Sequence, residues 1–145
     1  MLNLFFEVVV IVFLLISSYF DIKKRKIPNL IILCLLVIAV FSIIIQNKNL
    51  ISYLFGMLIP SLILIVLNFL HKNFIGNGDI KLLIVTGLLI GYHANLLVFS
   101  MSCILSITFA IVYKTLTKET LSSLPFAPFI TLSIIFYKTS TFLID

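Results

Sequence analysis

Long apolar runs fill almost the whole chain and are separated only by short polar stretches. Four of them approach the roughly 20 residues that a helix needs to cross the hydrocarbon core of a bilayer. These four cover residues 2–20, 27–46, 50–70 and 124–144. A fifth run, from Asp79 to Tyr113, would form a helix of about 52 Å, which is too long for one span. We expect it to break near Gly91 into helices over 79–91 and 95–113.

The composition excludes most soluble classes of protein. Of the 145 residues, 62% are hydrophobic and only 10% are charged, whereas a soluble domain is about 45–50% apolar and about 25% charged. Too little polar surface is present for a soluble enzyme, a disordered chain or a nucleic-acid-binding protein. We therefore predict an all-α, polytopic integral membrane protein of about six transmembrane helices, forming one membrane-embedded domain over residues 1–145.

The basic residues predict the orientation in the membrane. The first apolar run is followed, not preceded, by Lys23-Lys24-Arg25-Lys26, so it is a permanent span with its N-terminus outside and not a cleaved signal peptide. In a six-span layout, eight of the ten Lys and Arg residues then face the cytoplasm, as the positive-inside rule requires. These eight are Lys23, Lys24, Arg25, Lys26, Lys72, Lys81, Lys114 and Lys118. This orientation predicts a cell (plasma or inner) membrane protein with its candidate site on the cytoplasmic side.

Two of the five acidic residues stand at predicted cytoplasmic helix ends. Asp21 ends the first run, and Asp79 opens the fourth helix after Gly76-Asn77-Gly78. Charged side chains at membrane depth are costly and usually functional. Two carboxyl groups that converge in a partly dry site share a proton and act together as acid and base. The pair therefore predicts aspartic-protease chemistry, which needs no metal, cofactor or nucleophilic side chain.

The local sequence also suggests a division of labour between the aspartates. A helix N-terminus favours an anion and a C-terminus disfavours one, so we expect Asp79 to be the ionised member and Asp21 to hold the shared proton. The four basic residues after Asp21 could cancel this bias. Gly76 and Gly78 are expected to provide positive φ or a close backbone approach.

Three motifs resemble those of the type IV prepilin peptidases. Asp21-Ile-Lys-Lys-Arg-Lys-Ile-Pro-Asn29 resembles the family's first-aspartate motif with its Ile-Pro-Asn element. Gly76-Asn-Gly-Asp-Ile-Lys81 resembles the GxGD motif with its following lysine. Pro125-Phe-Ala-Pro-Phe129 resembles the start of the last helix. The order of the motifs and the six-span layout fit as well, so the resemblance covers essentially the whole chain.

The resemblance implies a membrane aspartic endopeptidase. Such an enzyme cuts the short basic leader from prepilins or pseudopilins at the cytoplasmic face, typically after a glycine, and uses no metal or cofactor. By position, Asp21 and Asp79 would be its catalytic pair. The supporting motif residues would be Gly76, Gly78, Lys81, Pro28 and Asn29.

Cysteine usage indicates a short form of the family. Cys34 and Cys103 are isolated within apolar runs and form no CxxC pair. The chain thus resembles the peptidase-only members of tight-adherence pilus systems and the archaeal preflagellin peptidases, which lack the N-terminal segment linked to methylation.

Two alternatives remain open from the sequence. One is a GxGD protease that acts on another peptide precursor. The other is a non-enzymatic transporter or assembly protein that uses the aspartate pair, although a transporter usually shows repeated halves and residues 1–70 and 71–145 show no repeat. The role of Lys81 is also open: its amine could reach the headgroups or favour one ionised carboxylate.

Overall fold

The computed structural model describes residues 2–46, 49–70, 76–118 and 124–144, and all regular structure in these ranges is helical. The elements are α1 (Leu2–Lys24), α2 (Asn29–Ile45), α3 (Leu50–Leu70), α4 (Asn77–Ile90), α5 (Tyr92–Thr117) and α6 (Ala127–Ile144). The predicted all-α class is confirmed. The long fifth run does break at Gly91, whose φ of 82° lies in the left-handed region that glycine adopts without strain.

Helix ends differ from the predicted ones because the prediction followed apolar runs. The predicted first run stops before Asp21, whereas α1 continues to Lys24 and ends where Arg25 turns left-handed with a φ of 51°. In contrast, α6 starts only at Ala127. Leu124 precedes Pro125, and the residue before a proline is disfavoured in the helical conformation.

Within the residues that the structure describes, three helices have the length and apolar character to cross a membrane: α1 from Phe5, α3 and α5. Of the others, α2 has 17 residues and α4 has 14. The helices thus fit a membrane protein. The six-span layout with the N-terminus outside stays a prediction, and Lys72, one of the residues that carried it, lies outside the described ranges.

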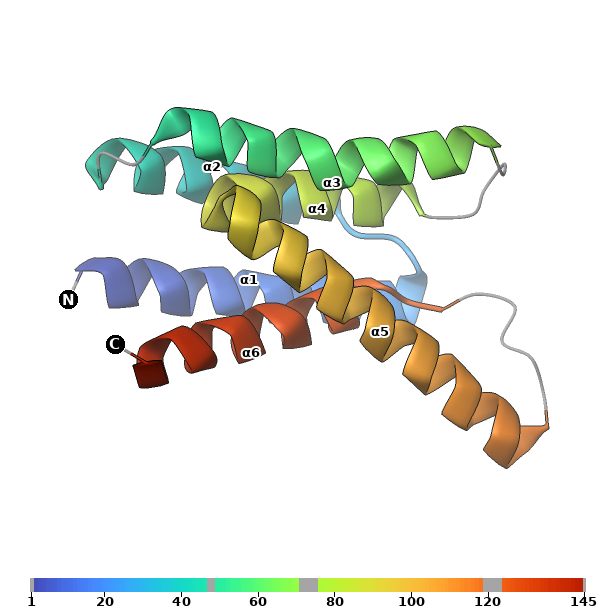
Figure 1. The fold of residues 1–145 in the computed structure, drawn as a ribbon. Helices are drawn as coiled ribbons and strands as arrows, with labels where there is room; N and C mark the ends of the chain where they lie inside the picture. Colours follow the sequence, from blue (N-terminus) through green and yellow to red (C-terminus); the bar gives the residue numbers. More distant parts are fainter. Residues whose placement is uncertain (1, 47–48, 71–75, 119–123, 145) are drawn as a thin grey trace.

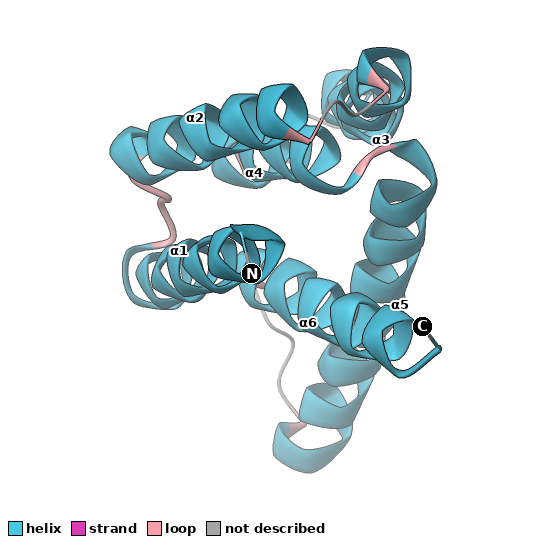
Figure 2. Cartoon of the chain, turned by 90° about the vertical axis from the view of Figure 1, so that its left-hand side faces the viewer, coloured by secondary structure: helices cyan, strands magenta, loops and turns pink. Residues whose placement is uncertain are grey.

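The helices form two layers joined by α5. Helices α1 and α6 lie side by side in one layer, and α2 and α4 lie in the other, with α3 beside α4 (Figure 2). Helix α5 crosses from α3 and α4 to α6, and both termini lie at one end of the bundle (Figure 1). Asp21 and Asp79 therefore belong to different layers.

Helices α3 and α4 meet with their backbones in contact. A Cβ atom on Gly87 would lie 2.2 Å from the carbonyl oxygen of Gly56, and one on Gly56 would lie 2.7 Å from the carbonyl carbon of Gly91. Real Cβ atoms are not found at such distances, so any side chain at Gly56 or Gly87 would push the two helices apart. This contact fixes where α4 lies against α3.

Asn95, fully buried in the first turn of α5, joins this helix to α3 and α4 by hydrogen bonds. Its Nδ2 donates to the carbonyl oxygen of Gly56 at 2.9 Å, and its Oδ1 accepts from Thr86 Oγ1 at 3.0 Å. Pro60 lies within α3 and has no N–H to give to the carbonyl four residues earlier, which is that of Gly56. The Asn95 amide thus replaces the hydrogen bond that Pro60 removes.

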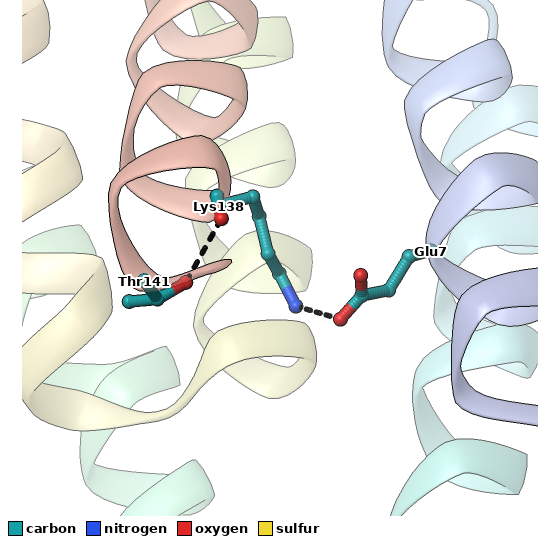
Figure 3. Close-up of polar contacts among 3 residues, drawn as sticks. All are labelled: Glu7, Lys138 and Thr141. Carbon is teal, nitrogen blue, oxygen red and sulfur yellow. Dashed lines mark hydrogen bonds and ion pairs between the residues drawn. The ribbon is translucent and has the colours of Figure 1, made fainter. Parts of the chain in front are cut away.

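Helices α1 and α6 are joined by polar contacts along their length. Ser18 Oγ and Thr131 Oγ1 share a buried hydrogen bond of 2.7 Å near the C-terminal end of α1 and one turn into α6. Near the termini, Lys138 forms an ion pair with Glu7 (Figure 3). Beside that ion pair a cavity of about 80 Å³ lies between the layers, lined by side chains of α1, α2, α4 and α6. The layers are thus incompletely packed at the end opposite to the aspartates.

We expect Asn95→Leu to lower the free energy of unfolding by about 1–3 kcal/mol, because the buried Gly56 carbonyl loses its partner. In a Pro60→Ala background the helix regains an N–H for that carbonyl, so the same substitution should cost less. The measurement compares the thermal midpoints of the wild type, both single variants and the double variant in one detergent. An equal cost in both backgrounds would show that Asn95 does not replace the missing bond.

Candidate active site

Asp21 lies in the last turn of α1 and is 6% exposed. Its backbone carbonyl accepts from Arg25 N–H at 2.9 Å, which closes the helix end. Its side-chain Oδ2 accepts a hydrogen bond of 3.1 Å from the backbone N–H of Ala127, the first residue of α6. The carboxyl group is therefore held by a donor from a helix that is remote in sequence.

Asp79 lies in the first turn of α4 and is 8% exposed. Its backbone N–H donates to the Gly76 carbonyl at 3.0 Å, which starts the helix. Its side-chain Oδ1 is buried and has no hydrogen-bond partner among the described residues. Buried polar atoms are usually satisfied in folded proteins, and exceptions occur at catalytic positions.

The two buried carboxyl groups belong to helices of different layers, α1 and α4, and the charge of Asp21 acts on Asp79. Burial and the presence of a second carboxyl group both disfavour two simultaneous negative charges. The sharing of one proton between the two acids, which the sequence led us to expect, stays a prediction.

The glycines of the Gly76-Asn77-Gly78 segment do not act through positive φ. Gly76 has an ordinary φ of −64°, and Gly91 is the one glycine in the described ranges with a positive value. The expectation of positive φ was therefore wrong, because the backbone here simply enters a helix. What Gly76 provides is space, since a Cβ there would lie 3.0 Å from Asp79 Oδ2. A Cβ on Gly78 would meet only the Ile27 side chain, at 3.4 Å.

Lys81 contacts neither of the groups expected from the sequence but a side chain of α2. Its Nζ donates to Asn29 Oδ1 at 3.0 Å, and both residues are exposed. Asn29 is the first residue of α2, and the Pro28 carbonyl accepts from Ile31 N–H at 3.1 Å in the same turn. The lysine of one motif thus ties α4 to the Pro-Asn element of the other.

One component of the site was missed from the sequence, namely the backbone N–H of Ala127. Backbone donors carry no residue signature, but the segment Pro125–Phe129 had been identified as a motif. Within the described ranges, no group of three or more His, Cys, Asp or Glu residues has the geometry to hold a metal ion.

Comparison with known proteins decides the family. The model of the type IV leader peptidase family matches residues 8–111, a range that contains both aspartates and most of the bundle. The chain belongs to the type IV leader peptidase family. This confirms the resemblance seen in the sequence motifs and makes the chain a membrane peptidase. Neither a search of curated proteins nor a search of solved structures gives a match.

Helix α6 lies beyond the range that matches the family. The matched range contains Asp21 and Asp79, which lie on separate helices. The Ala127 N–H that donates to Asp21 belongs to α6 and lies outside the matched range. The catalytic role of the two aspartates remains a prediction at this point.

We expect Gly76→Ala to reduce peptide cleavage about tenfold to a hundredfold, because the added methyl group displaces the Asp79 carboxyl group and small misplacements are costly. Gly78→Ala, in the same turn, adds a methyl group in ordinary contact with Ile27 and should cost less. Initial rates on one leader-bearing substrate, compared at equal amounts of folded protein, test this order. Equal losses would indicate that Gly76 does not act through the space beside Asp79.

Proposed function

We propose that this peptidase is an aspartic endopeptidase that removes the basic leader of prepilin-like or pseudopilin-like proteins at the cytoplasmic face of the cell membrane. The observation that carries the proposal is the pair of buried carboxyl groups, Asp21 and Asp79, within electrostatic reach of each other in a chain of the leader peptidase family. The partners of the enzyme are then the pilin substrate and the lipid bilayer.

Hydrolysis by this pair balances without any other group. The ionised carboxylate takes a proton from a water molecule while the water oxygen attacks the carbonyl carbon of the scissile peptide bond. The protonated carboxyl group gives its proton to the carbonyl oxygen, which yields a tetrahedral gem-diol. When the C–N bond breaks, the first group returns its proton to the leaving amine, and the second regains one from a gem-diol hydroxyl. The pair ends in its starting state.

The charges around Asp21 fit cleavage at a cytoplasmic membrane surface. Lys23, Lys24, Arg25 and Lys26 follow it and are all exposed. Basic residues beside a membrane are attracted to anionic headgroups, and a basic leader is attracted to the same headgroups. Both would therefore gather at one surface, which places the leader next to the aspartates although the enzyme and leader carry like charge.

Membership of a peptidase family favours proteolysis over the transporter or assembly role. The alternative of a different peptide precursor differs only in substrate. A panel of substrates that contains a leader-bearing pilin and a peptide precursor with an unrelated leader distinguishes the two candidate substrates. Only the pilin carries a basic leader with a glycine before the cut.

Co-expression with a leader-bearing pilin should yield the processed pilin, and Asp21→Asn and Asp79→Asn should each lower processing about a thousandfold, since each removes a group that transfers a proton. The products are resolved by mass spectrometry of the pilin N-terminus. Processing at the wild-type rate by either variant would exclude the proposed pair.

Glu7→Gln is the matched control, because it removes the other described acid of α1. Glu7 lies at the far end of the helix in a partly exposed ion pair with Lys138 (Figure 3). Such pairs contribute little to stability, so processing should stay within about twofold of the wild type.

A further inference from the structure

The N-terminus of α6 directs the backbone N–H groups of Phe126 and Ala127 at Asp21. The first turn of a helix leaves N–H groups without partners inside the helix. In α6 the Phe126 carbonyl accepts from Phe129 and Ile130, at 3.1 and 3.2 Å, and Pro128 has no N–H. The N–H of Ala127 is thus left over, and it donates to Asp21 Oδ2 at 3.1 Å. Phe126 has no side-chain acceptor, so the Asp21 carboxyl group caps α6 from another helix.

The register between α1 and α6 is fixed beside this contact. Thr131, one turn into α6, shares a hydrogen bond of 2.7 Å with Ser18 and donates to the Leu14 carbonyl at 3.3 Å. Asp21 lies one turn further along α1. The donor and the carboxyl group are therefore held in place by contacts that do not involve the substrate.

Asp79 has the opposite surroundings. Its buried Oδ1 accepts no hydrogen bond from the described residues, in contrast to Oδ2 of Asp21. Hydrogen bonds to an ionised acceptor are roughly twice as strong as those between neutral groups, so the donor at Asp21 favours the charge there. The dipole of α4, which pointed to Asp79 as the anion, competes with this contact. The dipole of α6 adds to the contact, because Asp21 lies at the α6 N-terminus.

We propose that the backbone N–H of Ala127 is a positioning element of the catalytic site that holds Asp21 as the water-activating carboxylate and leaves the shared proton on Asp79. This assignment rests on the proposed function. Asp21 then takes the proton of the attacking water, and Asp79 gives its proton to the carbonyl oxygen of the scissile bond. The order is the reverse of the one expected from the dipoles of α1 and α4 alone.

Few other charges act on Asp21. Arg25, the residue that follows the end of α1, acts on Asp21 through its charge, and the charge of Asp21 in turn acts on Asp79 of α4. From α6 the contacts are backbone donors at its first turn. A change confined to the α6 backbone therefore tests the donor while both of these charges stay in place.

The test changes the number of donors at the α6 N-terminus. Ala127→Pro removes the N–H at a position where proline suits a helix, and Ala127→Gly keeps it as the matched control. Pro128→Ala has the opposite effect, because it adds an N–H at the next position, where capping oxygens usually accept. Cleavage of a leader peptide is measured from acid to neutral pH with purified protein in detergent, and the thermal midpoint reports folding.

The pH at which the rate falls to half on the acid side is the decisive readout, because a merely structural role would lower the rate without moving it. Ala127→Pro should move this pH upward and Pro128→Ala downward, each by about one unit for one donor, while Ala127→Gly leaves it in place. A folded Ala127→Pro variant with an unmoved acid side overturns the proposal.

If Ala127→Pro does not fold, Pro128→Ala decides: a downward shift supports the proposal and an unmoved acid side overturns it. Failure here is distinguishable from failure of the proposed function. In the first case the wild type cleaves and both aspartate variants do not, whereas in the second the wild type does not cleave the leader or an aspartate variant does.

Discussion

The backbone contact between Gly56 and Gly87 is the constraint on which the site depends. It brings α3 and α4 so close that no side chain fits between them. Asn95 donates a hydrogen bond to the Gly56 carbonyl, which has lost its helical donor because Pro60 has no N–H. Asp79 precedes Gly87 by eight residues on the same helix, or about 12 Å along its axis. The position of this carboxyl group is thus set by a contact two turns away from it.

Asp21 is positioned by a different set of contacts, those between α1 and α6. The Ala127 donor, the Ser18–Thr131 bond and the Glu7–Lys138 ion pair follow one another along this pair of helices. Helix α5 links the two sets, because Asn95 lies in its first turn and Ser102, further along, donates to Ser133 of α6 at 3.1 Å.

Much of this could be predicted from the sequence, because apolar runs report helices directly. The all-α class and the break at Gly91 followed from run lengths, and the scarcity of charge singled out the two aspartates that the structure buries. Helix ends were less accurate, since Lys23 and Lys24 are polar yet continue α1. The Lys81–Asn29 bond was not foreseen, because it joins residues 52 positions apart.

The roles proposed for the aspartates depend on a contact that their local sequence does not show. The dipoles of α1 and α4 are local features of each aspartate, and a donor from another helix is not. The Ala127 donor comes from 106 residues away, and no periodicity in the neighbourhood of Asp21 reports it. The same holds for Gly76, whose φ is ordinary and whose value lies in the room it leaves for a neighbouring oxygen.

The layered arrangement has a mechanical consequence. One carboxyl group moves with α1 and α6 and the other with α4, so their separation is a property of the boundary between the layers and not of either layer. A cavity of about 80 Å³ at the other end of that boundary means that the layers are not locked by dense packing along their whole length. Helices that span a bilayer tilt to match its thickness. The thickness of the surrounding lipid therefore affects how the two layers lie and, with them, the distance between the two carboxyl groups.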